Sequence, residues 1–153
     1  MVLNNSDKSE LVAALLNSGR TVRIQVAGWS MKPLLVSGRF LHVAPVDEPL
    51  RVGEIALFRG DDGKLTTHRV FSQSSDIILA KGDSCTTFDG PRRLDQILGR
   101  VVRVEGPVPI LTDNGLSRWL GLCLSNLYPR LVRMKSTVRH WLGQTASQGA
   151  SRV

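Results

Sequence analysis

Four polar residues of this 153-residue chain have the types and order that a serine-based catalytic site requires. Ser30 stands in the segment GWSMKP, where Gly28 lets a backbone or a substrate approach closely. His68 follows in TTHRVF, and Asp83 and Asp89 follow in KGDSCTTFDG. A serine hydroxyl becomes a nucleophile when a histidine removes its proton and an aspartate holds the imidazole. The order therefore predicts a serine nucleophile with His68 as its general base.

Each of these residues also has an ordinary structural explanation. A serine in a turn is commonly structural, and an aspartate beside a glycine commonly starts a turn. Two lysines compete with His68 for the role of base. A lysine must be strongly desolvated to act at neutral pH, whereas a histidine, with a pKa of about 6.5, needs little tuning. We therefore expect Lys81 to be structural or a charge partner of Asp83, and Lys32 to point to solvent.

Short strand-like segments surround the four residues. Residues 21–28 alternate apolar and polar side chains, which is typical of a strand with one buried face, and they lead toward Ser30. Further segments of strand length, separated by turn signals such as DDG and GDS, cover residues 39–46, 53–60, 64–73, 76–83 and 97–105. Short strands with tight connections predict a mainly β domain over residues 21–108, built as a compact antiparallel β barrel or rolled sheet.

Helical segments are expected on both sides of this domain. Residues 1–20 predict a short amphipathic helix, in which Asp7 and Glu10 resemble a capping box. Residues 109–143 predict a basic amphipathic helical tail that Pro129 breaks or kinks. The apolar stripe before the proline contains Leu116, Trp119, Leu120, Cys123, Leu124 and Leu127, and the stripe after it contains Leu131, Met134, Val138, Trp141 and Leu142. Residues 144–153 are small and polar, and we expect them to be disordered.

The formal net charge of +7 is concentrated in this tail. The first 113 residues hold 14 basic and 13 acidic side chains, and no acid follows Asp113. A basic helix with an apolar stripe can lie in the headgroup layer of an anionic membrane. The alternative, which we favour slightly, is that the stripe packs on the β domain or on a partner chain. A nucleic-acid partner is not expected.

The cysteines and the hydrophobic runs bear on the compartment. Cys85 and Cys123 cannot form a disulfide framework, and they lack the paired spacing of a zinc site. The first 20 residues carry two acids and a short apolar run, unlike a secretory signal. No window reaches the roughly 20 apolar residues that span a bilayer. We therefore expect a cytoplasmic protein, with peripheral contact to the inner membrane face as an option, and we expect no metal or cofactor.

Five segments of the chain together resemble a known family. GWSMKPLLVSGR, VGEIALFR, THRV, AKGDSCTTFD and ILGRVVRV follow one another as do the motifs of signal peptidase I-like serine peptidases, a class that also contains the LexA-type self-cleaving repressors. The resemblance covers about residues 22–105 and implies the barrel or rolled sheet of that class. It is strongest to the archaeal and endoplasmic-reticulum type, in which a histidine replaces the lysine of bacterial enzymes. It implies that Ser30 attacks, that His68 is the base, and that Asp83 or Asp89 orients the imidazolium.

Two departures from that family limit what the resemblance implies. Signal peptidases of this type commonly have a serine two residues before the nucleophile, which helps to bind the oxyanion, whereas this chain has Gly28. The oxyanion would then rely on backbone N–H groups, including that of Ser30. Mitochondrial inner-membrane peptidases also lack that serine. The second departure is the missing transmembrane anchor, which makes general removal of secretory signals doubtful.

The sequence therefore predicts a serine endopeptidase that cleaves a peptide or precursor protein. We expect the substrate to bind extended near Ser30 and to pair with a sheet edge. One alternative is a non-catalytic peptide-binding relative. Another is a self-cleaving regulator, although the 29 residues before Ser30 are too few for a helix-turn-helix domain and His68 stands in place of the usual lysine.

Overall fold

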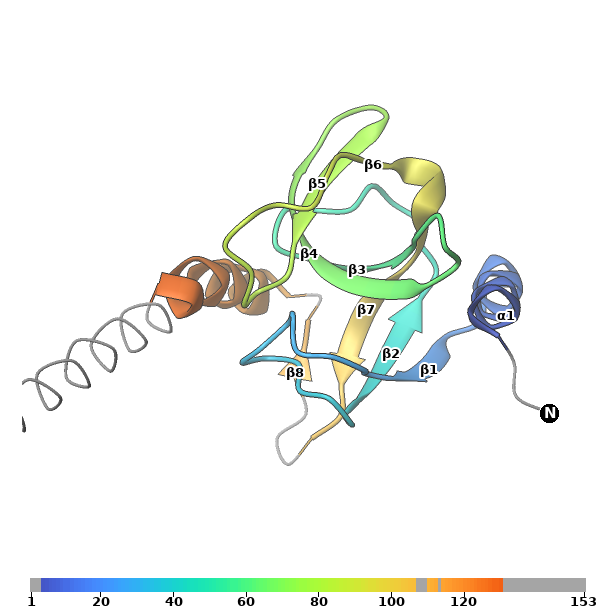
Figure 1. Cartoon of the computed structure of the whole chain (residues 1–153), viewed down its shortest axis with the longest axis horizontal. Coiled ribbons are helices and arrows are strands. Elements are labelled where there is room, and N and C mark those ends of the chain that lie inside the picture. Colours follow the sequence, from blue (N-terminus) through green and yellow to red (C-terminus); the bar gives the residue numbers. More distant parts are fainter. Residues whose placement is uncertain (1–3, 107–109, 113, 131–153) are drawn as a thin grey trace, which may run out of the picture.

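A single antiparallel sheet forms the centre of the protein. The computed structural model describes residues 4–106, 110–112 and 114–130. Within them the strand order is β1-β2-β7-β3-β4-β5-β6, with β8 paired to β7, and the sheet curls into a half-barrel (Figure 1). The strands are β1 (Val22–Gln25), β2 (Phe40–Ala44), β3 (Ile55–Arg59), β4 (Leu65–Gln73), β5 (Ile77–Lys81), β6 (Arg92–Arg93), β7 (Ile97–Val104) and β8 (Ile110–Leu111). The predicted mainly β, antiparallel fold is confirmed.

Strand β3 lies in the middle of the sheet and separates two core clusters. Ile55 and Leu57 belong to one cluster, and Ala56 and Phe58 belong to the other. Successive side chains of a strand point to opposite faces, so both faces of β3 are buried. Burying one large aliphatic or aromatic side chain contributes about 1.5–3 kcal/mol. These clusters therefore fix β3 and, through its hydrogen bonds, the neighbouring strand β4 that carries His68.

Helix α1 (Asn5–Asn17) begins three residues earlier than the predicted capping box requires. Its N-cap is Asn4, whose side-chain oxygen accepts a hydrogen bond of 2.8 Å from the backbone N–H of Asp7. Asp7 therefore lies in the first turn, and the prediction that it caps the helix is wrong. Leu16, near the other end of α1, is buried in the first core cluster and fastens the helix to the sheet.

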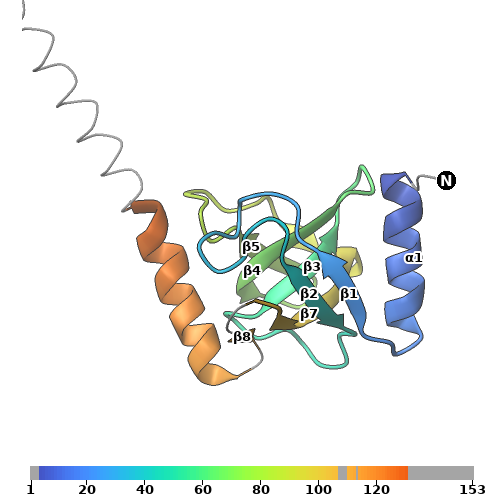
Figure 2. The ribbon, with the colours of Figure 1, turned by 90° about the horizontal axis from the view of Figure 1, so that it is seen from below.

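The second helix covers residues 115–130 and lies on the side of the sheet opposite to α1 (Figure 2). It approaches the sheet with small residues: Gly121 and Ser125 are buried. A Cβ added at Gly121 would lie 2.3 Å from Nη1 of Arg69 in β4, so only glycine permits this contact. The large apolar side chains of the stripe are exposed instead, namely Leu116, Trp119, Leu120, Leu124 and Leu127. Of the two packing surfaces expected for this stripe, the β domain is therefore wrong for these five residues, and a partner chain stays a prediction.

Several predicted boundaries can be compared with the structure. Pro129 lies within the helix over residues 115–130, so the helix does not end before it. The sheet extends past residue 108, because β8 pairs with β7. The predicted stripe over residues 131–142 and the predicted disorder of residues 144–153 lie outside the described residues. Neither helix of the described chain has the length and apolar character that crossing a bilayer requires.

Candidate active site

Ser30, His68 and Asp89 come from three different segments and meet at one place. Ser30 lies in the turn that follows β1, His68 in β4, and Asp89 in the loop between β5 and β6. Nε2 of His68 lies 3.2 Å from Oγ of Ser30. Nδ1 of the same ring is hydrogen-bonded to Oδ2 of Asp89. The His68 side chain is 10% exposed, so these contacts are largely shielded from water. The chain from carboxylate to imidazole to hydroxyl has the connectivity of a serine catalytic triad.

Asp83 is not part of this chain of contacts. Its two carboxylate oxygens accept hydrogen bonds from Nε and Nη2 of Arg69, at 2.8 and 2.6 Å. Both side chains are almost completely buried, and Nη1 of Arg69 donates a third bond, of 2.7 Å, to the carbonyl of Gly53. Of the two aspartates that the sequence left open, the structure brings Asp89 to the histidine and places Asp83 in a buried ion pair.

The loop after β5 positions Ser30 through two residues that the sequence interpretation did not single out. A Cβ added at Gly82 would lie 2.6 Å from the carbonyl oxygen of Ser30, so a glycine is needed where the two segments touch. Ser84 donates to that same carbonyl from its backbone N–H, at 2.8 Å, and from its hydroxyl, at 2.9 Å. Both residues belong to the segment AKGDSCTTFD, which thus lies against Ser30 although the two are far apart in the sequence.

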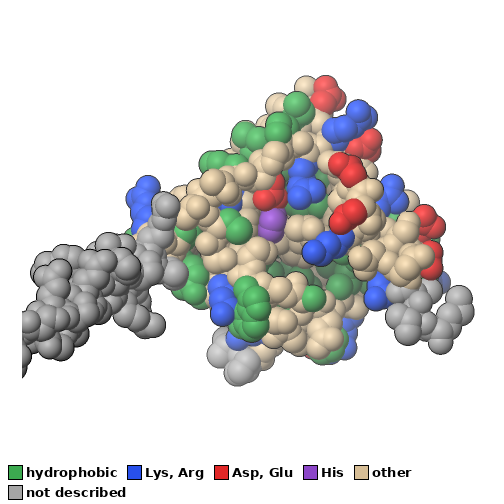
Figure 3. All heavy atoms as spheres, viewed as in Figure 1, with side chains coloured by type: hydrophobic (Ala, Val, Ile, Leu, Met, Phe, Trp, Pro, Cys, Tyr) green, Lys and Arg blue, Asp and Glu red, His purple; other side chains and the backbone are tan. Residues whose placement is uncertain are grey.

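Arg92, at the start of β6, is a further residue that sequence reasoning missed. Its Nε lies 3.5 Å from Oδ2 of Asp89. Burial raises the pKa of Asp89, but the hydrogen bond and charge of His68 together with the charge of Arg92 outweigh it and hold that pKa below its usual value. Figure 3 shows a histidine side chain at the surface with an acidic and a basic side chain directly beside it. Arg92 thus helps to keep Asp89 ionised, as a partner for an imidazolium must be.

The two lysines considered as rival bases have other contacts. Nζ of Lys81 donates a hydrogen bond of 2.8 Å to the backbone carbonyl of Ser125, and it lies 5.1 Å from the ring centre of Phe71. Lys81 therefore ties β5 to the helix over residues 115–130, in keeping with the expected structural role. Nζ of Lys32 lies 4.0 Å from the centre of the Trp29 ring. The ion-pair partner of Asp83 is Arg69 and not Lys81.

Gly28 has a backbone conformation that explains its presence. Its φ angle is +109°, a value that side chains other than hydrogen disfavour, although the space beside it is open. A serine there would strain the backbone. Among the described residues, the backbone N–H of Ser30 donates no hydrogen bond. This N–H therefore has no partner among the described residues, and its role as an oxyanion donor stays a prediction.

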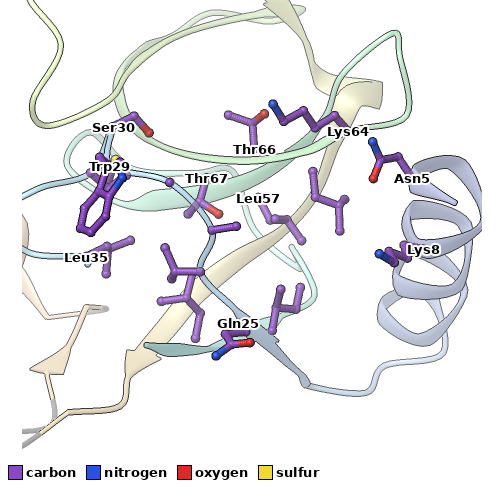
Figure 4. A pocket seen from close by; sticks show the side chains of 17 residues that line it. Asn5, Lys8, Gln25, Trp29, Ser30, Leu35, Leu57, Lys64, Thr66 and Thr67 are labelled. Atoms are coloured by element: carbon purple, nitrogen blue, oxygen red, sulfur yellow. The ribbon is translucent and has the colours of Figure 1, made fainter. Parts of the chain in front are cut away.

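A groove of about 520 Å³ leads away from Ser30. It lies between two strand edges that are unpaired within the described sheet. β1 pairs only with β2, and β5 pairs with β4 from Arg69 onward, which leaves residues 65–68 of β4 open on that side. Ile24 and Gln25 line the groove from β1, and Thr66 and Thr67 line it from β4. Figure 4 shows Ser30 and Trp29 at one end of the groove and Lys64, Asn5 and Lys8 at the other.

Comparison of the chain with family models, with curated proteins and with solved structures found no match. Within the described residues, no group of three or more histidine, cysteine, aspartate or glutamate side chains is placed to hold a metal ion.

Proposed function

We propose that this protein is a serine endopeptidase with Ser30 as nucleophile, His68 as general base and Asp89 as the residue that orients the imidazole. The observation that carries the proposal is the chain of contacts from Oγ of Ser30 through both ring nitrogens of His68 to Asp89. The resemblance of the motifs to signal peptidase I-like enzymes supports the same assignment. Asp83 then has a structural role, because its carboxylate is occupied by Arg69.

In the proposed reaction, Oγ of Ser30 attacks the carbonyl carbon of a peptide bond while Nε2 of His68 takes the hydroxyl proton. The negative charge that forms on the carbonyl oxygen is met by the backbone N–H of Ser30. His68 then returns its proton to the departing amine, which leaves an ester on Ser30. A water molecule, deprotonated by His68, hydrolyses the ester and regenerates the free serine. Throughout, Asp89 stabilises the charged imidazolium.

The groove supports a peptide as substrate. An extended peptide placed between β1 and residues 65–68 of β4 could pair its backbone with both open edges, as in β-strand addition. Its side chains would alternate between the apolar floor, which includes Leu35 and Leu57, and the solvent. Because backbone groups carry much of such binding, the groove suits unstructured segments rather than folded domains.

Reaction with a fluorophosphonate probe tests the nucleophile directly. The wild-type protein should be labelled at Ser30, and Ser30→Ala should abolish labelling. Ser75→Ala is the matched control, because Ser75 is an exposed serine in the turn between β4 and β5, and it should react like wild type. Equal labelling of the wild-type protein and Ser30→Ala would refute the proposal, and a complete lack of labelling in folded wild-type protein would favour a non-catalytic peptide-binding role.

We also propose that the protein works at the cytoplasmic face of a membrane, to which the helix over residues 115–130 attaches it peripherally. Trp119 is 61% exposed and Leu127 54% exposed, so the stripe is free to enter a headgroup layer. The sequence after Asp113 contains six basic residues and no acid, which complements anionic lipid. The free thiols of Cys85 and Cys123 fit a reducing compartment.

A further inference from the structure

The end of the groove that lies away from Ser30 is positively charged. Lys8 and Lys64 are the charged residues among the 17 that line the groove, and no acidic residue lines it. Within the described residues, neither ammonium group forms an ion pair. The rest of the groove is lined mainly by apolar and hydroxyl side chains. The two lysines, which have no anionic partner, can therefore bind an anionic group of the substrate.

The two lysines are positioned by contact between α1 and the turn that joins β3 to β4. A Cβ added at Gly63 would lie 3.0 Å from Cα of Ser6, so the first turn of the helix rests on this turn. Lys8 and Asn5 of the helix therefore line the same groove as Lys64, and Figure 4 shows the Lys64 side chain extending along the groove toward Thr66. The positive end of the helix dipole lies here too and adds to the local positive potential.

The separation between the lysines and the bond that is cleaved can be estimated from the rise of β4. Thr66 and His68 share one face of β4, since alternate residues of a strand point the same way, and Lys64 immediately precedes this strand. Lys64 precedes His68 by four residues, which corresponds to about 13 Å of extended backbone. An extended peptide in the groove has the same rise per residue, so its side chain about four residues from the scissile bond lies beside the lysines.

We infer that the substrate carries an aspartate or glutamate about four residues from the cleaved bond, and that Lys8 and Lys64 are specificity residues that recognise it. The inference rests on the proposed peptidase function. Exposed lysine–carboxylate pairs are weak, so two of them together should favour an acidic residue by about three- to tenfold in cleavage rate.

Cleavage-site profiling with a library of proteome-derived peptides tests this inference. Full-length protein is incubated with the library, new termini are identified by mass spectrometry, and Ser30→Ala supplies the background. In the Ser30-dependent cleavages, aspartate and glutamate should be enriched about three- to tenfold near one position, about four residues from the cut. The double variant Lys8→Glu/Lys64→Glu should prefer lysine or arginine at that position, which a merely structural role of the two lysines would not produce.

The double variant Arg20→Glu/Arg51→Glu is the matched control, because it reverses two exposed charges outside the groove. It should keep the acidic preference of wild type. Ser30-dependent cleavage with no acidic preference, or with the same preference in Lys8→Glu/Lys64→Glu as in wild type, would overturn the inference and leave the peptidase function standing. Wild-type cleavage no greater than that of Ser30→Ala would overturn the peptidase function itself, and the inference with it.

Discussion

Replacing Asp83 and Asp89 by asparagine, one at a time, should separate folding from catalysis. Asparagine has one acceptor oxygen where aspartate has two, so Asp83→Asn leaves one N–H of the Arg69 guanidinium unpaired and its charge uncompensated. Arg69 is 1% exposed and Asp83 is fully buried, so water cannot replace the lost contact. Breaking one partner of a buried ion pair costs about 3–5 kcal/mol.

That loss is large against a typical total stability of about 5–15 kcal/mol for a domain of this kind. It corresponds to a fall in Tm of about 10–20 °C. Asp89→Asn should behave differently, because the Asp89 side chain is 19% exposed and can be hydrated in part. Its free energy of unfolding should change by about 1 kcal/mol at most. Its reactivity should fall by about 10⁴-fold, as expected when a triad carboxylate no longer fixes the histidine tautomer.

Two measurements on the same three proteins are sufficient. Urea unfolding followed by tryptophan fluorescence gives the stability, and the rate of fluorophosphonate labelling at a temperature where all three are folded gives the reactivity. Asp83→Asn should unfold at much lower urea than wild type, whereas Asp89→Asn should unfold near wild type and react very slowly. A stable Asp83→Asn together with a fully reactive Asp89→Asn would refute the assignment of the two carboxylates.

Four further outcomes are expected. His68→Ala should abolish peptide cleavage while Lys81→Met, checked for folding, keeps measurable activity; the reverse result would indicate a Ser-Lys mechanism. Gly28→Ser should lower the free energy of unfolding by about 1–2 kcal/mol without faster labelling, because φ at this position is +109°; faster labelling would show that the site lacks an oxyanion donor. Hydrogen bonds from Arg23 and then His42 lower the pKa of Glu105 from 4.5 to about 2, so the stabilisation present above pH about 4.5 should be lost as the pH falls toward 2. The urea midpoints of wild type and Glu105→Gln should therefore converge over that range, and a constant difference would count against the ionised network. Trp119→Ser/Leu124→Ser should weaken co-sedimentation with anionic vesicles at low salt, whereas Leu11→Ser, an exposed leucine on α1, should not; equal and negligible pelleting of all three proteins would exclude the membrane attachment.

The longer strands and the pairing of Ser30 with His68 could be predicted because each has a recognisable local pattern in the sequence. Alternating side chains mark β1, and the motif order places Ser30 and His68 in one domain. The two-residue strands β6 and β8 are too short to show any alternation in the sequence. They form by pairing with the longer strands β5 and β7. The described helix over residues 115–130 lies within the predicted helical tail over residues 109–143, and residues 131–143 of that prediction lie outside the described residues. The alternative in which the stripe packs on the β domain assumes that large apolar residues face the sheet, whereas the sheet side of the described helix is lined by Gly121 and Ser125.

Which aspartate contacts His68 depends on the alternation of side chains along β4. The sequence shows this alternation, but it identifies the aspartate only when the path of the loop after β5 is known. His68 and Arg69 are neighbours on this strand, so their side chains point to opposite faces. An aspartate on the outer face meets His68, and an aspartate on the inner face meets Arg69. Both aspartates follow β5 within eight residues, and either could be turned to either face. The glycine at position 82, held against Ser30, fixes the loop so that Asp83 points inward.

The same alternation couples the candidate catalytic histidine to the tail helix. Arg69 holds the inner face of β4 through Asp83 and the carbonyl of Gly53, and Gly121 of the helix covers its guanidinium. Lys81, paired with Arg69 in the register of β4 and β5, donates to the carbonyl of Ser125 one turn further along the helix. The helix thus closes the buried side of the strand whose other side presents His68 to Ser30. Its small residues pack against the strand that carries the candidate histidine, which leaves its large apolar residues free to contact a surface outside the molecule.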